Sequence, residues 1–225
     1  NALNPVRMIK DIAADVLKAH LKPGEKLDAK QIYDRVYAHF DRIGMDTKRV
    51  LNSFPINLTA GERQRCVIAI STILLPKMVI ADEPTSALDV STQKEVIKMI
   101  FDLLDKGIFQ SMIFITHELP LLYHVADNIA IMYAGEIVEK GTAEQVVKDP
   151  RHPYTQALMG AMLSTEASQR GRHPVAIEGA PPSLKNKIVG CRFAPRCSKA
   201  CPDCKKNTQN LRIVGDRDVR CDYAK

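Results

Sequence analysis

The amino-acid sequence predicts an α/β protein with a parallel sheet, a helical N-terminal part and a small cysteine-rich C-terminal extension. The first observation is a set of short apolar runs, at residues 78–82, 112–116 and 128–133, typical of buried strands. The second is that segments of helical periodicity separate these runs, which favours parallel pairing. The third is that periodicity fades after residue 163, where cysteines gather.

Two amphipathic helices are predicted near the N-terminus. The first covers residues 6–22 and ends at Pro23-Gly24, a pair that does not continue a helix. The second covers residues 28–43, where apolar side chains recur at helical spacing.

A capping box predicts where the next helix begins. Thr59 is followed three residues later by Glu62, a pair that satisfies free N–H groups at a helix N-terminus. Pro76 lacks an N–H group and should end this helix.

The strand at 78–82 comes next, and we expect it to be buried on both faces because its run is continuously apolar. A helix over 91–105 separates it from the strand at 112–116. After the strand at 128–133, we expect a capped helix and then another at 153–163. Residues 164–190 carry Ser, Gly, Arg and Pro-Pro and indicate a linker.

Composition narrows the class of protein. The 225 residues are 45% hydrophobic, enough for a core, and contain no run of about 18 uncharged apolar residues, so no transmembrane helix is expected. The first residues lack the basic flank and apolar core of a signal peptide. Residues 151–225 hold 14 Lys and Arg against 6 Asp and Glu, but without an aromatic stacking platform, so we expect no nucleic-acid site.

Five of the six cysteines lie in this basic tail. Because no export signal is visible, metal or cluster binding is favoured over disulfides. Cys66 lies on the helix after Thr59 and is expected to be a small buried side chain.

Two adjacent carboxylates follow the strand at 78–82. Open α/β sheets bind ligands at the carboxyl ends of their strands, where Asp82 and Glu83 lie. Such a pair commonly holds a hydrated Mg²⁺ with the first acid and polarises a water with the second. His117 follows the strand at 112–116 and should emerge at the same edge. Thr59, Ala60 and Gly61 begin a helix, and we expect their free N–H groups to form an anion site.

Three segments, in this order, resemble the nucleotide-binding subunit of an ATP-binding cassette (ABC) transporter: LTAGERQR (58–65), MVIADEPTSALD (78–89) and ITHEL (115–119). They are similar to the family's signature loop, its Walker B strand with D-loop, and its switch histidine. The resemblance implies a P-loop NTPase-like sheet with a helical subdomain, and it implies ATP and Mg²⁺ as cofactors.

The resemblance also implies a role for each residue. Asp82 would hold Mg²⁺ through water, Glu83 would be the catalytic base, and His117 would contact the γ-phosphate. Residues Thr59 to Glu62 would contact ATP bound to the opposite subunit, and Asp89 would lie at that dimer seam.

The signature segment departs from the family's usual Leu-Ser-Gly-Gly-Gln. Thr59 keeps the hydroxyl, while Ala60 adds a methyl group where backbone should approach phosphate. Glu62 places a carboxylate near the anion, although the capping box gives it another role.

No Gly-rich loop ending in Lys-Ser/Thr, the P-loop that cradles phosphate, occurs in the sequence. NALNPVRMI (1–9) resembles the segment after the family's Q-loop, so we expect this Walker A loop upstream of residue 1. Either the product is truncated, or the loop is disordered or on another chain. We therefore expect the polypeptide alone not to bind ATP tightly and to lack ATPase activity.

The C-terminal part resembles the oligopeptide, dipeptide and nickel importer branch of the family, in DPRHPYTQALMG (149–160) and GCRFAPRC (190–197). Some members of that branch hold a 4Fe–4S cluster with cysteines at a similar spacing, here Cys191, Cys197, Cys204 and Cys221. Zinc is the rival, because Cys201 and Cys204 form a Cys-x-x-Cys pair.

The resemblance implies the energy-coupling subunit of an importer for peptides or related solutes, peripheral on the cytoplasmic face of the membrane. Its partners would be membrane permeases, a second ATP-binding subunit in a homo- or heterodimer and, indirectly, an extracytoplasmic solute-binding protein. The expected domains are a helical subdomain (1–57), the C-terminal part of the ATPase core (58–148) and the extension (149–225). A non-catalytic subunit binding permease or metal is the alternative, and a soluble ABC protein of DNA repair or translation is another.

Overall fold

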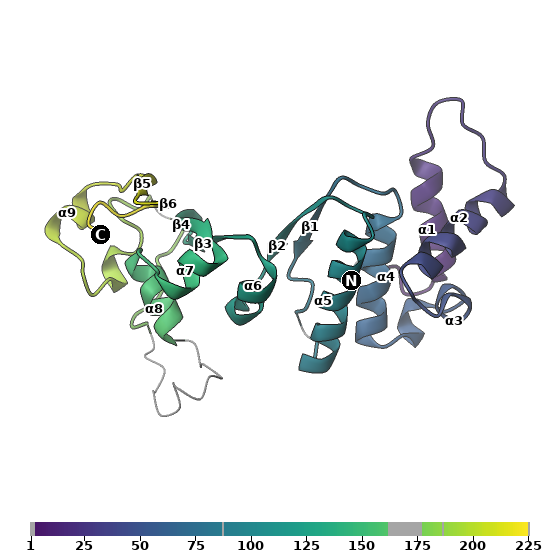
Figure 1. The fold of residues 1–225 in the computed structure, drawn as a ribbon, viewed down its shortest axis with the longest axis horizontal. Helices are drawn as coiled ribbons and strands as arrows, with labels where there is room; N and C mark the ends of the chain where they lie inside the picture. Colours follow the sequence, from purple (N-terminus) through teal and green to yellow (C-terminus); the bar gives the residue numbers. More distant parts are fainter. Residues whose placement is uncertain (1–2, 87, 162–176, 186, 225) are drawn as a thin grey trace. The chain divides into compact units, whose positions relative to one another are not determined.

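The computed structural model describes residues 3–86, 88–161, 177–185 and 187–224. The chain divides into two compact units, Asn1–His117 and Glu118–Lys225, and each is described by itself (Figure 1). The end of the helix predicted at 153–163, and residues 164–176 and 186 of the predicted linker, lie outside the described residues.

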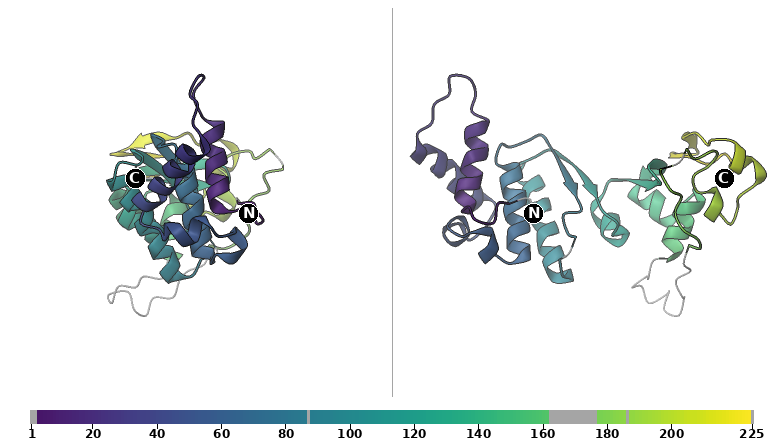
Figure 2. Two further views of the ribbon diagram at one scale, coloured as in Figure 1. Left: turned by 90° about the vertical axis from the view of Figure 1, so that its right-hand side faces the viewer. Right: turned by 180° about the vertical axis from the view of Figure 1, so that it is seen from behind.

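The first unit contains mostly helices and two strands. In chain order they are α1 (Ile9–Ala19), α2 (Ala29–Arg42), α3 (Thr47–Leu51), a 3₁₀ turn (Pro55–Asn57), α4 (Ala60–Thr72), β1 (Met78–Asp82), α5 (Val90–Asp105) and β2 (Ser111–Ile115). The segment between α1 and α2 extends away from the helices in Figures 1 and 2. The sequence predicted all of these except the short α3 and the 3₁₀ turn.

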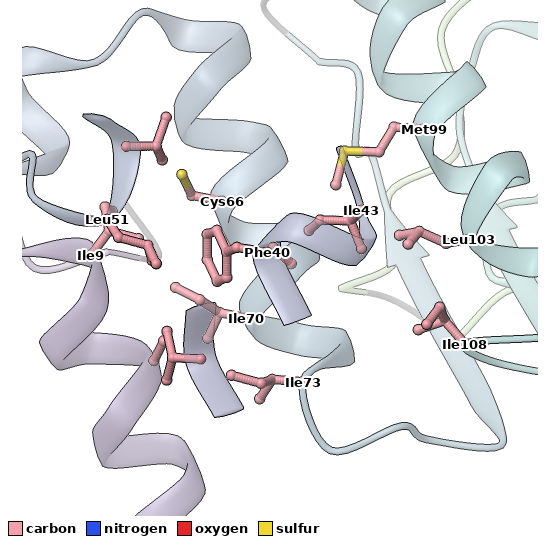
Figure 3. Close-up of a cluster of buried hydrophobic side chains, with 14 of the residues drawn as sticks. Ile9, Phe40, Ile43, Leu51, Cys66, Ile70, Ile73, Met99, Leu103 and Ile108 are labelled. Atoms are coloured by element: carbon pink, nitrogen blue, oxygen red, sulfur yellow. The ribbon is translucent and has the colours of Figure 1, made fainter. Parts of the chain in front are cut away.

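One apolar core joins these helices. Phe40 is fully buried and lies near Cys66 and Ile70 of α4 (Figure 3). His39 is one of the buried polar residues of this unit, with its Nε2 3.0 Å from the carbonyl of Ala69. The predicted burial of Cys66 is confirmed, and burial raises the pKa of its thiol to about 12.

Strands β1 and β2 pair in parallel, from Met78 opposite Ser111 to Asp82 opposite Ile115. Their side chains alternate between half-buried and exposed, and Ile80 is 60% exposed. The expectation that 78–82 is buried on both faces is therefore wrong for this structure. Only one face packs against the core.

The second unit contains a sheet of four antiparallel strands. In chain order its elements are α6 (Leu119–Val125), β3 (Asn128–Tyr133), β4 (Glu136–Thr142), α7 (Ala143–Lys148), α8 (Pro153–Ala161), a 3₁₀ turn (Ala194–Arg196), α9 (Pro202–Lys206), β5 (Arg212–Val214) and β6 (Arg217–Val219). The strand order is β3-β4-β6-β5, and every pairing is antiparallel.

The prediction that 128–133 continues a parallel sheet is wrong, although the strand itself is present. Ala134 and Gly135 both have positive φ, 48° and 83°, as in the two-residue turns that join hairpin strands. This turn returns the chain at once as β4, so no crossover helix follows. No helix among the described residues is long and apolar enough to cross a membrane.

Candidate functional site

The two predicted catalytic residues lie together at the carboxyl ends of β1 and β2. The backbone N–H of Glu83 donates to the carbonyl of Ile115 at 2.9 Å, which extends the parallel ladder by one residue. The Nδ1 of His117 lies 2.9 Å from Oε1 of Glu83. An ionised carboxylate only accepts hydrogen bonds, so Nδ1 carries the hydrogen in this pair.

The second carboxylate oxygen of Glu83 differs from the first. Oε2 is buried and has no hydrogen-bond partner among the described residues. A buried acceptor without a partner is costly, and a water molecule is the ordinary group that satisfies it. Glu83 can therefore hold a water with Oε2 while His117 fixes Oε1.

Asp82 is the last residue of β1, and its side chain is exposed beside Glu83. Within the described part of the chain, no group of three or more His, Cys, Asp or Glu side chains is arranged to hold a metal ion. A single exposed carboxylate suits Mg²⁺, which usually takes one or two protein carboxylates and fills its other positions with waters and phosphate. The donor set at this edge fits Mg²⁺ on a nucleotide.

The predicted capping box at the start of α4 is confirmed. The Glu62 N–H donates to Thr59 Oγ1 at 3.2 Å, and the Thr59 N–H donates to Glu62 Oε2 at 2.9 Å. The other Glu62 oxygen is paired with Arg49. The Thr59 N–H and Arg49 together hold the pKa of Glu62 below its usual range. The carboxylate is thus bonded both to the start of its own helix and to Arg49 of α3.

Asp89 caps α5, a role that sequence reasoning missed. It accepts hydrogen bonds from the backbone N–H and the hydroxyl of both Ser91 and Thr92, between 2.6 and 3.1 Å. These bonds, those from the hydroxyls first, hold the pKa of Asp89 far below its usual range. The signal was an Asp two residues before Ser-Thr at a helix start.

Thr92 also links α5 to the signature segment. A Cβ atom at Gly61 would overlap the γ-methyl group of Thr92, so α4 and α5 approach closely at this glycine. The structure therefore connects Gly61 to Asp89 through Thr92. The predicted site residues of this unit therefore form two groups. One lies around Glu83 and the other around the start of α4.

The four predicted cysteine ligands, Cys191, Cys197, Cys204 and Cys221, line one cavity of about 350 Å³. Burial raises the pKa of the Cys191 thiol, while the backbone N–H groups of Phe193 and Ala194 act in the opposite direction. Cys201 does not line the cavity, but its Sγ lies 3.3 Å from Sγ of Cys204.

A buried ion pair anchors the segment next to this cavity, and sequence reasoning missed it. Glu139 and Arg217 are 3.7 Å apart, with side chains 0% and 3% exposed. Glu139 also accepts from the backbone N–H of Arg151 and of His152. His152 is itself buried, its Nδ1 accepts from the N–H of Tyr154 at 3.0 Å, and burial lowers its pKa to about 4. These contacts give His152 a packing role and fix the turn that leads into Tyr154.

Comparison with protein families yields two matches. The family model described as ABC transporter matches residues 6–86, and the one described as oligopeptide/dipeptide transporter, C-terminal region, matches residues 138–204.

Curated relatives agree with both. The chain is 35% identical to the dipeptide transport ATP-binding protein DppD of Caldanaerobacter subterraneus, over 98% of this chain and 66% of the relative. It is 42% identical to the oligopeptide transport ATP-binding protein OppD of Bacillus subtilis, over 88% of this chain and 54% of the relative. The chain thus spans between about half and two thirds of these relatives.

Among solved structures, cbiO1 from Clostridium perfringens, part of the ABC transporter complex cbiONQ, matches with a TM-score of 0.55 and 25% identity. The match covers 66% of this chain and 56% of cbiO1. A dimeric post-hydrolysis ATP-binding cassette bound to ADP and Pi has the same fold, with a TM-score of 0.52 at 20% identity over 63% of this chain and 59% of that one. The resemblance found in the sequence is confirmed, and the chain belongs to the ABC transporter ATP-binding proteins, in the branch with the oligopeptide/dipeptide transporter C-terminal region.

Proposed function

We propose that this chain is part of the energy-coupling ATPase subunit of an ABC importer for peptides or related small solutes. The observation that carries the proposal is the Glu83–His117 pair, 2.9 Å apart at the carboxyl ends of two parallel strands. The relatives named above are ATP-binding proteins of dipeptide and oligopeptide transport, which supports the class of solute.

In this proposal Glu83 is the general base for ATP hydrolysis. Its buried Oε2 accepts a hydrogen bond from the attacking water and takes the proton as the water attacks the γ-phosphate. His117 fixes the carboxylate through Oε1 and lies where the γ-phosphate would be bound. Mg²⁺, held through water by Asp82, would neutralise charge on the phosphates.

The start of α4 would serve the second ATP of a dimer. The first N–H groups of a helix bind anions, and Ala60 and Gly61 begin α4 directly after its N-cap Thr59, whose own N–H is bonded to Glu62. Glu62 would repel phosphate if it faced the site, but its carboxylate is bound to the Thr59 N–H and to Arg49. Asp89 would lie at the same dimer seam, with a homodimer or a heterodimer both compatible with these residues.

The partners follow from the same proposal. A second ATP-binding subunit completes the ATP sites, membrane permeases bind the helical part, and a solute-binding protein acts indirectly through them. The subunit would be peripheral on the cytoplasmic face of the membrane. In this proposal the subunit has a helical subdomain (1–57), the C-terminal part of the ATPase core (58–148) and the extension (149–225).

The proposal is tested in a chain extended at its N-terminus by the P-loop-containing segment of a relative. The extended chain should hydrolyse ATP with Mg²⁺, while the 225 residues alone should show no ATPase activity. Glu83→Gln should lower turnover about 10²–10⁴-fold, because an amide cannot take up the proton. His117→Ala should also lower it strongly.

The matched control is Glu95→Gln, which removes an exposed carboxylate of α5 and should leave turnover unchanged. Parent-level turnover in Glu83→Gln would show that Glu83 is not the base. Absence of ATPase in the extended parent, with ATP still bound, would favour a non-catalytic subunit.

A metal centre in the extension is the second candidate function, because four cysteines line one cavity. We propose a 4Fe–4S cluster held by Cys191, Cys197, Cys204 and Cys221, with zinc as the rival. The four thiols line one cavity, and thiolates are the ligands that both a 4Fe–4S cluster and zinc require. Backbone N–H groups near Cys191 would also stabilise cluster-bound thiolate.

Anaerobic purification with iron, sulfide and zinc analysis tests this candidate. We expect about four iron and four sulfide per chain, lost in Cys221→Ser and kept in the control Cys66→Ala. One equivalent of zinc without iron would contradict the cluster. Unchanged metal content in Cys221→Ser would show that Cys221 is not a ligand.

A further inference from the structure

Cys201 is the cysteine of the C-terminal extension that the proposed metal centre does not use. It immediately precedes α9, and its side chain is half-buried, whereas Cys204 lies within α9 and is buried. Their sulfur atoms are 3.3 Å apart. The chain between them is short and fixed, because the Cys204 N–H donates to the Cys201 carbonyl at 3.1 Å.

We propose that Cys201 and Cys204 form a reversible disulfide when the protein meets a low-molecular-weight disulfide. A disulfide has a sulfur–sulfur bond of about 2.05 Å, so the two atoms must approach by about 1.2 Å. Small rotations about the two side chains supply this movement.

The reaction has two exchange steps. The half-buried Cys201, as thiolate, attacks one sulfur of the small disulfide, which forms a mixed disulfide and releases one small thiolate. Cys204 then attacks the sulfur of Cys201, which closes the protein disulfide and releases the second small thiol. The protein loses two electrons and two protons, and the small disulfide gains both.

The consequence for the cavity depends on the proposed metal centre. Cys204 is one of the four cysteines that line it, so a Cys201–Cys204 disulfide leaves three thiols there. A centre that needs four thiolates would be lost or would not assemble. Cys201 would thereby make metal binding in the extension sensitive to oxidation.

The metal-free 225-residue chain tests the disulfide itself. It is incubated anaerobically with oxidised glutathione, quenched with acid, alkylated and mapped by mass spectrometry. We expect a Cys201–Cys204 link, loss of two thiols per chain, and full reversal by dithiothreitol. Cys201→Ser should form no protein disulfide at Cys204, and Cys197→Ser should behave like the parent. A persistent glutathione adduct on Cys201, a link from Cys204 to another cysteine, or unreacted thiols at both positions would overturn the proposal.

The metal-loaded chain tests the consequence. In oxidised glutathione the parent should release metal as the disulfide forms, and Cys201→Ser should retain it several-fold longer. Disulfide formation with unchanged metal content would support the Cys201–Cys204 disulfide but would show that Cys204 is not a metal ligand. The disulfide proposal and the metal-centre proposal can therefore fail separately.

Discussion

Glu83 has a backbone conformation that is rare for a residue with a side chain. Its φ is +47°, in the left-handed region, which costs of the order of 1 kcal/mol or more for a non-glycine residue. Two contacts oppose this strain, its N–H bond to Ile115 and its carboxylate bond to His117. Strain of this kind is concentrated at functional sites, which agrees with a positioned catalytic base.

Gly61 offers a test of the link between the signature segment and α5. In Gly61→Ala the new methyl group overlaps the γ-methyl of Thr92, whose rotation is opposed by its hydroxyl bond to Asp89. Overpacking of this kind costs about 1–3 kcal/mol, so we expect a lower free energy of unfolding in urea. Adding Thr92→Ser should restore most of it, because serine keeps the hydroxyl and lacks the methyl.

The helical Gly160 serves as the control, since a Cβ there meets nothing within 4 Å. Parent-like stability in Gly61→Ala, or no rescue by Thr92→Ser, would contradict the proposed contact.

His39 should make stability depend on pH. Burial lowers its pKa in the folded protein, with Arg42 acting in the same direction, so the unfolded chain takes up the proton at a higher pH. The stability due to neutral His39 is complete above the ordinary pKa of about 6.5 and falls as the pH drops below it, by about 1.4 kcal/mol per unit of pKa difference.

The measurement is the free energy of unfolding at pH 7.5 and pH 5.5. His39→Gln keeps an N–H donor for the Ala69 carbonyl but does not titrate, so its stability should fall less over this interval. An equal fall in both proteins would exclude His39 as the cause.

At the scale of elements, the sequence predicted those features whose interacting residues lie close together in the chain. The capping boxes at Thr59 and Thr142 were visible because both partners lie within four residues. The hairpin of β3 and β4 was missed because Ala-Gly is a weaker turn signal than Asn-Gly. The bond between Glu83 and His117 was not predictable, since the sequence placed them only at the same sheet edge.

The cysteine cavity depends on one glycine. Gly190 has a φ of +77°, and a Cβ there would lie 2.5 Å from the carbonyl oxygen of Cys204 and 2.7 Å from the backbone of Lys205. That close approach accompanies the 2.7 Å bond from the Cys191 N–H to the Cys204 carbonyl. A side chain at Gly190 would therefore separate two of the cysteines that line the cavity.

Gly190→Ala and Gly179→Ala form a matched pair, because both glycines have a φ of +77° but only Gly190 has backbone in the way. Both should lose about 1–2 kcal/mol to the left-handed conformation. Gly190→Ala should lose more and bind clearly less metal per chain, measured by urea unfolding and metal analysis. Equal metal content in the two variants would contradict this account of the cavity.

At the scale of the whole molecule, the basic surplus of the tail is largely used within the fold. Arg217 donates to the carbonyls of Gln145 and Asp149, and Arg220 donates to those of Ile137 and Gln209. Arg151, Arg192, Arg196 and Arg212 likewise bond backbone carbonyls. These guanidinium groups join loops that have few apolar residues. The absence of a nucleic-acid site stays a prediction, and this use of arginine supports it.

Each unit has a core of its own, and the chemistry assigned to each is separate. Glu83 and His117, the residues proposed for ATP hydrolysis, belong to the first unit, and the cysteine cavity belongs to the second. The two family matches, 6–86 and 138–204, include Glu83 in the first unit and Cys191, Cys197 and Cys204 in the second, whereas His117 and Cys221 lie outside them.

The central claim is that Glu83, held by His117, is the base for ATP hydrolysis in a dimer. The most direct measurement is the chemical state of the nucleotide retained by Glu83→Gln in the P-loop-extended chain, after incubation with ATP and Mg²⁺ and separation by size. The account predicts a dimer that retains uncleaved ATP, because the water is bound but not deprotonated. Retention of ADP in the proportion found for the parent would contradict it.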